Sequence, residues 1–148
     1  MKSKISYWSA TIAIVLLMTP ALQASPLHDA AYSGNLEKIN TLVKAGNDVN
    51  QIDSQGIWPL LAAATSGQVA AARLLIKLGA NPGQSDQYGY TALHEAASVG
   101  FRDVAEVLIE AKVEINARDI NGYSAVGYAL RSGNQDVADF LQEFGGAR

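Results

Sequence analysis

The chain has 148 residues, enough for one domain of ordinary size, and 49% of them are hydrophobic although only 7% are aromatic, which suits small, closely packed helices. The absence of cysteine excludes disulfide bonds, thiolate metal sites and cysteine nucleophiles. With a formal net charge of −3, the chain lacks the excess of basic residues that a nucleic-acid-binding protein needs to contact phosphates.

The first 24 residues have the order of a secretory signal peptide. The segment begins with two lysines, continues with a mostly apolar run over residues 5–18 and ends with small residues near position 24. We expect cleavage between Ala24 and Ser25, with cleavage after Ala21 as the second choice. This signal fits a bacterial export substrate, and it places the mature protein in a periplasm or outside the cell.

The alternative for this segment is an uncleaved membrane anchor. The apolar run is short for that role, because the 15 residues of 5–19 give about 22 Å of helix and the hydrocarbon core of a bilayer is about 30 Å thick. Cleavage removes two lysines, so the mature chain of residues 25–148 carries 9 basic and 14 acidic side chains. We expect this chain, with a net charge of −5, to bind neither membrane nor nucleic acid.

Beyond residue 24 the sequence repeats with a period of 33 residues. Asp53, Asp86 and Asp119 recur at this spacing, and glycines recur with them. A fixed period of this size is typical of a stacked repeat array. Each unit is expected to form a turn, a short helix, a tight glycine bend and a second, antiparallel helix. We call the units repeats one to four: 25–52, 53–85, 86–118 and 119–148.

Repeat three carries the clearest motif, because residues 91–97 read TALHEAA. This stretch resembles the TPLHxAA signature of the ankyrin repeat. The resemblance implies an all-α solenoid of helix-turn-helix repeats with β-hairpin-like loops, curved into an L-shaped stack. Repeat two departs from the signature, with Trp58 in place of the threonine and Leu61 in place of the histidine.

Two further positions predict how helices begin and end. Ser25 precedes the first helix and is expected to cap it, with its hydroxyl accepting a free backbone N–H. Lys112 stands where the family prefers glycine after a helix, and a left-handed backbone there costs lysine about 1 kcal/mol more than glycine.

The residues that could carry chemistry favour structural roles. His28 and His94 are the only histidines, and both stand in the histidine position of the repeat, where the family uses it for hydrogen bonds within and between turns. The periodic aspartates are expected to be acceptors that stabilise turns. Glu106 and Glu110 lie four residues apart on an outer helix and are expected to be solvated. We therefore predict that the protein is not an enzyme and holds neither cofactor nor metal.

The resemblance implies a protein partner, bound by the hairpin tips and the concave face of the first helices. The same position in successive repeats, which we call a column, is occupied by Ile57, Tyr90 and Tyr123. This column predicts an apolar stripe, although both tyrosines could instead pack across adjacent turns. Trp58 either fills the gap left by the missing threonine or forms the centre of the recognition surface. The full set of candidates is Tyr32, Ile57, Trp58, Tyr88, Tyr90, Tyr123, Tyr128 and Arg131.

The leading hypothesis is an exported, monomeric protein that resembles bacterial periplasmic ankyrin-repeat proteins. It would mediate protein–protein interaction as an adaptor, inhibitor or protective partner of another periplasmic protein. The alternatives are a secreted effector that binds a host protein and, if the signal is not cleaved, a membrane-anchored interaction module.

Overall fold

The computed structural model describes residues 25–148, and the signal-peptide prediction, including Ala21 and Ala24, lies outside this range. Residues 25–148 fold into eight helices without a strand, which confirms the prediction of an all-α solenoid. None of these helices is long and apolar enough to cross a membrane.

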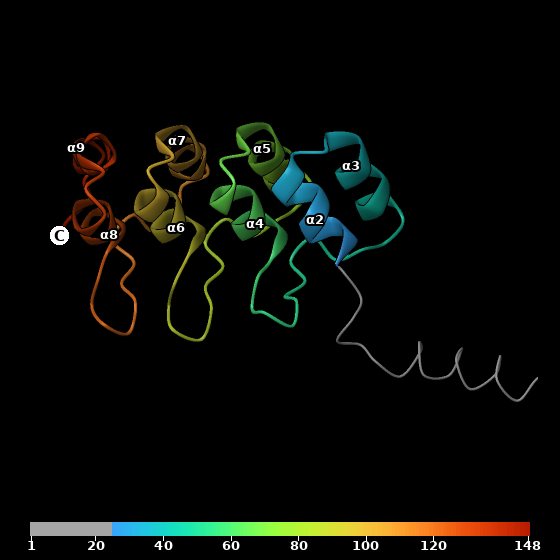
Figure 1. Ribbon diagram of the computed structural model, residues 1–148, viewed down its shortest axis with the longest axis horizontal. Coiled ribbons are helices and arrows are strands. Elements are labelled where there is room, and N and C mark those ends of the chain that lie inside the picture. The colour runs from blue at the N-terminus through green and yellow to red at the C-terminus, as the bar shows by residue number, and fades with distance from the viewer. Residues whose placement is uncertain (1–24) are drawn as a thin grey trace, which may run out of the picture.

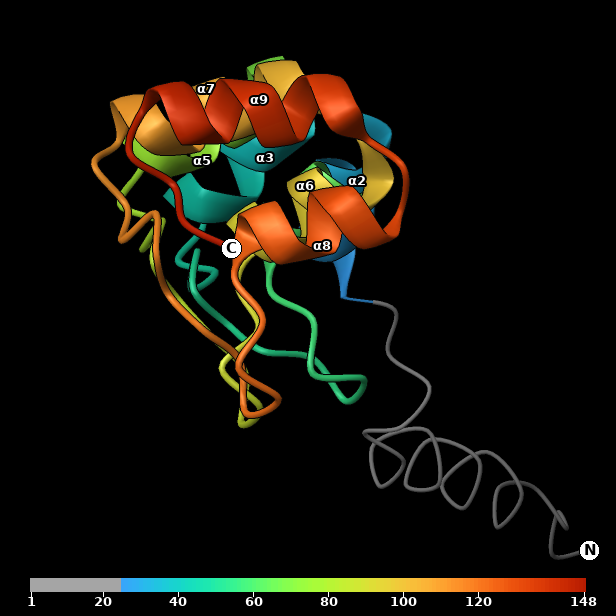
Figure 2. The ribbon, with the colours of Figure 1, turned by 90° about the vertical axis from the view of Figure 1, so that its left-hand side faces the viewer.

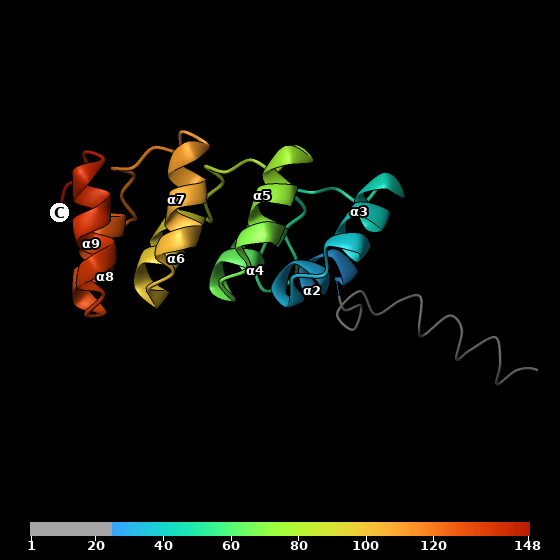
Figure 3. The ribbon, with the colours of Figure 1, turned by 90° about the horizontal axis from the view of Figure 1, so that it is seen from above.

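The helices form two parallel rows, and each repeat contributes one helix to each row (Figure 1). Viewed along the stack, the loops that join successive repeats project away from both rows and give the molecule the outline of an L (Figure 2). From above, the row of second helices runs across the molecule with one helix per repeat (Figure 3). The first row contains α2 (Pro26–Ser33), α4 (Pro59–Thr65), α6 (Ala92–Val99) and α8 (Ala125–Arg131), and the second contains α3 (Leu36–Lys44), α5 (Val69–Lys77), α7 (Arg102–Glu110) and α9 (Gln135–Glu143).

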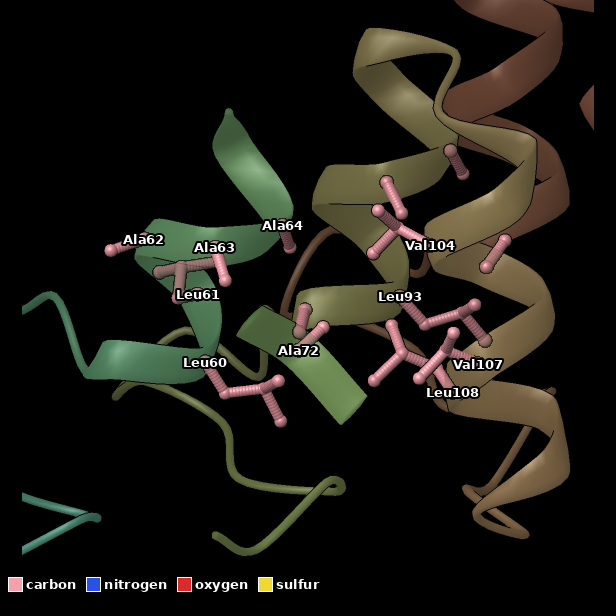
Figure 4. Close-up of a cluster of buried hydrophobic side chains, with 14 of the residues drawn as sticks. Leu60, Leu61, Ala62, Ala63, Ala64, Ala72, Leu93, Val104, Val107 and Leu108 are labelled. Atoms are coloured by element: carbon pink, nitrogen blue, oxygen red, sulfur yellow. The ribbon is translucent and has the colours of Figure 1, made fainter. Parts of the chain in front are cut away.

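Small side chains bring the first helices together. Each of these helices packs against the next, and Ala63 of α4 and Ala96 of α6 are completely buried. Larger side chains fill the space between the rows, where Leu60 and Leu108 belong to one cluster (Figure 4). Complete burial of one such leucine contributes about 2 kcal/mol, so contacts between neighbouring repeats hold the stack together.

The bends between helices have the expected backbone. Gly67 has a φ of +71°, and a Cβ there would lie 2.8 Å from the ring of Phe101, so both conformation and space require glycine. Lys112 has a φ of +61°, which confirms the prediction of a left-handed residue at the end of α7.

Helix capping differs between repeats. The hydroxyl of Thr91 accepts the N–H of His94 at the start of α6, and Ser124 accepts the N–H of Gly127 at the start of α8. Ser25 is the N-cap residue of α2, but its hydroxyl makes no capping hydrogen bond, so that part of the prediction was wrong.

Candidate partner-binding surface

The hairpin loops are shaped by their periodic aspartates. Asp86 Oδ1 accepts the N–H of Tyr88 at 2.8 Å and the N–H of Tyr90 at 2.9 Å. Asp53 and Asp119 make the same pair of bonds two and four residues ahead. These bonds confirm the prediction that the aspartates are turn-stabilising acceptors, and they hold the tip side chains in a fixed register.

His94 joins repeat three to the hairpin of repeat four. Its Nε2 donates to the carbonyl oxygens of Ala117 at 3.1 Å and Tyr123 at 3.2 Å, while its Nδ1 accepts the N–H of Thr91 at 3.1 Å. Burial lowers the pKa of His94, and the neutral ring suits this site because Nδ1 faces a donor. The structural interpretation of this histidine is confirmed.

His28 forms the equivalent link between repeats one and two. Its Nε2 lies 3.0 Å from the carbonyl oxygen of Gln51 and 2.9 Å from that of Ile57. Its Nδ1 is buried without a hydrogen-bond partner, in keeping with the missing cap bond of Ser25. The two histidines therefore play the same part, but only His94 uses both ring nitrogens.

An aromatic cluster surrounds His94 on the side of the hairpins. The ring of Tyr90 stacks on His94 with a centroid distance of 5.5 Å, and Tyr128 meets both rings edge-on. The Tyr90 hydroxyl donates to Glu95 at 2.7 Å, and the Tyr128 hydroxyl donates to Asp119 at 2.7 Å. Burial, assisted by the carboxylate acceptor, raises the pKa of Tyr90, and the same causes raise the pKa of Tyr128 to about 12.

The tips of repeats three and four touch each other. The N–H of Ile120 donates to the carbonyl oxygen of Tyr88 at 2.9 Å, and a Cβ at Gly89 would lie 3.1 Å from the carbonyl oxygen of Arg118. The tip of repeat two is displaced to one side of these two (Figure 2). The tips of repeats three and four are thus fixed relative to each other by a backbone hydrogen bond and by the close approach of Gly89 to the backbone of Arg118.

Comparison with known families identifies the repeats. A family model described as ankyrin repeats in three copies matches residues 27–119, and one described as ankyrin repeats in many copies matches residues 102–142. The chain belongs to the ankyrin-repeat family. No curated protein matches the sequence. Ankyrin repeats generally mediate protein–protein interaction and serve as non-enzymatic scaffolds. Within residues 25–148 of this ankyrin-repeat chain, no group of three histidine or carboxylate side chains could hold a metal ion.

The candidate residues of this ankyrin-repeat chain differ in accessibility. Tyr32, Tyr88 and Tyr123 have exposed fractions of 57%, 53% and 37%, and Arg131 is also exposed. Ile57, Tyr90 and Tyr128 are half-buried and pack against the core. Of the three residues of the expected apolar stripe, only Tyr123 is exposed. The contacts of Tyr90 with His94 and Tyr128 agree with the alternative that it packs across adjacent turns.

Trp58 lies in the core rather than on the recognition surface. Only 1% of its surface is exposed, and its indole N–H makes no hydrogen bond. The interpretation of Trp58 as the centre of the recognition surface is therefore wrong. Burial of its large ring removes apolar surface from water and agrees with the other interpretation, in which Trp58 fills the gap left by the missing threonine.

Two asparagines that the sequence pattern did not single out also position the ankyrin hairpins. Asn116 Nδ2 donates to the carbonyl oxygen of Gly145 at 3.1 Å, and its Oδ1 accepts the N–H of Ala147 at 2.7 Å. Asn50 of repeat one makes the same bonds to repeat two: it donates to the carbonyl oxygen of Gly79 at 3.3 Å and accepts the N–H of Asn81 at 2.7 Å. The sequence does contain a pattern that could have identified them, because Asn50 and Asn116 are two repeat periods apart. Gly83 stands at the equivalent position of the repeat between them.

Proposed function

We propose that the protein is exported and binds another protein through its hairpin tips and concave face, as an adaptor, an inhibitor or a protective partner. The observation that carries this proposal is the exposure of Tyr88, Ile120 and Tyr123 on two tips that are hydrogen-bonded to each other. Tyrosine supplies a large contact area with a polar end and is enriched at the energetic centres of interfaces. The protein acts by binding, as a monomer and without catalysis.

Site-specific photo-crosslinking tests the binding surface. A photoreactive amino acid replaces Tyr88 in one version of the full chain and Lys77, an exposed residue of α5, in a matched control. We expect a crosslinked partner from the Tyr88 position and none from Lys77. Crosslinks from Lys77 alone would place the interface on the second row of helices and contradict the proposal.

Alanine substitutions then measure how much the tips contribute. Once the partner has been identified by mass spectrometry, we expect Tyr88→Ala combined with Tyr123→Ala to weaken binding at least tenfold, about 1.4 kcal/mol or more. Phe144→Ala is the control, because Phe144 is 56% exposed at the end of α9 and away from the tips. Equal losses from both variants would indicate a general change in the fold.

The mature terminus and the location of the protein test export. We expect mass spectrometry of the periplasmic fraction to find a chain that begins at Ser25. A chain that still begins at Met1 in the membrane fraction would overturn export with cleavage and favour the anchored form. Recovery from the culture medium instead would favour a secreted effector that binds a host protein.

A further inference from the structure

The tips of repeats three and four, together with the last residue of α8, form a surface that we call the tip platform and define as Tyr88, Ile120, Tyr123 and Arg131. The backbone bond from Ile120 to Tyr88 fixes the two tips relative to each other. The ring of Tyr123 meets the edge of the Tyr128 ring, and its carbonyl oxygen accepts from His94. Side chains that are ordered before binding lose little conformational entropy when a partner arrives.

Arg131 is held in one position on this platform. Its guanidinium carbon lies 4.5 Å from the centroid of the Tyr123 ring, and its Nη1 donates to the Tyr123 hydroxyl at 2.6 Å. Guanidinium has five N–H donors in a planar fork, so this contact leaves most of them available. The side chain is also exposed, so the remaining donors can reach a partner.

The positive charge of Arg131 has no carboxylate partner among residues 25–148. The ion pair found in this part of the chain joins Arg73 and Glu110 on the second row of helices. Asp86, Glu95 and Asp119 belong to the same two repeats, and they accept N–H or hydroxyl hydrogen bonds rather than pairing with Arg131. The platform therefore presents a guanidinium group that takes part in no ion pair, next to the exposed ring of Tyr123.

The acidic side chains of this half of the molecule lie mostly elsewhere. Residues 86–148 carry 5 basic and 10 acidic side chains, but seven of the acidic ones are on α7, α9 or the turn after α7. That row lies on the far side of the first helices from the tips (Figure 2). Since exposed charges are screened over about 8 Å at physiological ionic strength, the acidic side chains of that row contribute little at the tips.

We propose that the tip platform binds an acidic side chain, Asp or Glu, of the protein partner, next to an apolar side chain that packs on Tyr88 and Ile120. The free donors of Arg131 would bind the carboxylate in the bidentate geometry that guanidinium favours. This inference rests on the proposed function, and it adds the chemistry of the partner's contacting residues.

Selection from a library of random peptides tests this chemistry before the partner is identified. The library is displayed on phage and selected against the wild-type protein and against Arg131→Glu and Tyr88→Ala. We expect the wild type to select peptides with Asp or Glu next to an apolar residue, and Arg131→Glu to select Lys or Arg instead. We expect Tyr88→Ala to bind more weakly and to keep the preference for acidic peptides.

Individual peptides then give the size of the effect. Replacing the selected Asp by Asn, or Glu by Gln, is expected to weaken binding to the wild type about tenfold and to leave binding to Arg131→Gln unchanged. Unfolding midpoints equal to the wild type verify that the variants fold. Selected peptides with the same charge preference for the wild type and for Arg131→Glu would overturn the inference. Selected peptides whose binding is insensitive to all of the platform substitutions would overturn the proposed binding surface as well.

Discussion

The junction between repeats three and four differs from the junction between repeats two and three. Across the former, His94 donates to two carbonyl oxygens of the loop that joins the two repeats, and Asn116 pairs with the loop that follows α9. Asn134 adds two bonds in the opposite direction, to the carbonyl oxygens of Ala97 and Ser98. We call this the polar junction.

The junction between repeats two and three, which we call the central junction, has apolar residues or glycine in the same columns. Leu61 replaces the histidine, Gly83 replaces the asparagine and Phe101 replaces Asn134. Phe101 packs its ring against Gly67, and Leu61 is buried. The buried ring of Trp58 lies in repeat two as well.

This difference shows that four repeats of one family need not form four equivalent contacts. Hydrogen bonds are directional and fix the relation of one repeat to the next, whereas apolar packing depends mainly on the area removed from water. Repeats one and two are also joined by a histidine and an asparagine, His28 and Asn50. The array is therefore two pairs of repeats, each joined by histidine and asparagine hydrogen bonds, and the contact between the pairs is mainly apolar, with the exposed ion pair of Arg73 and Glu110 as its polar link.

The largest expected effect comes from Trp58→Ala, which removes the largest buried side chain of repeat two. The cavity and the lost apolar contacts should lower the free energy of unfolding by about 3–5 kcal/mol, measured by urea denaturation. Trp58→Phe should cost less than half as much, because it keeps most of the apolar volume and removes an indole N–H without a partner. Equal losses from the two variants would contradict a packing role for this residue.

His94→Leu copies the residue of repeat two into the polar junction. The loss of the bonds to Ala117 and Tyr123, and of the acceptor for Thr91, should lower the free energy of unfolding by about 2–3 kcal/mol. His28→Leu should cost about 1 kcal/mol less, because Nδ1 of His28 has no partner to lose. A larger loss from His28→Leu would contradict the distinction between the two histidines.

Gly83→Asn should make the central junction more like the other two. By the period of the repeat, the new side chain would donate to the carbonyl oxygen of Lys112 and accept the N–H of Glu114. A Cβ at Gly83 has room, since the nearest other atom is 3.7 Å away. We expect a gain of about 1 kcal/mol in the free energy of unfolding. Asn116→Gly is the matched reverse change, and a loss of similar size there would verify the value of the bonds.

The smallest expected effect is a dependence of stability on pH that arises at the polar junction. Burial lowers the folded pKa of His94 below its ordinary value of about 6.5, so the unfolded chain binds a proton that the folded chain does not. The contribution of this group to stability is complete above about pH 6.5 and should fall as the pH decreases below it. Unfolding midpoints measured between about pH 7 and pH 5, where most carboxylates stay ionised, should show a weaker slope for His94→Leu. An unchanged slope would contradict the lowered pKa.

The sequence by itself was sufficient for the class of fold and for local backbone features. The period of 33 predicted the stack, the repeated aspartates predicted the turns, and Lys112 predicted a left-handed residue. These features depend on interactions within a few residues along the chain, which a sequence pattern records directly. The histidine links followed from the family motif, since the same position performs the same task in many such repeats.

The tertiary structure alone decided which residues a partner could touch. A column in the repeat gives the side of the molecule that a residue faces, but its depth depends on the size of the side chains in neighbouring repeats. Trp58 is therefore buried, Tyr90 is half-buried against His94, and Tyr123 remains exposed in the same column as Tyr90. The division into polar and apolar junctions likewise depends on contacts between residues about 30 positions apart, which no single repeat contains.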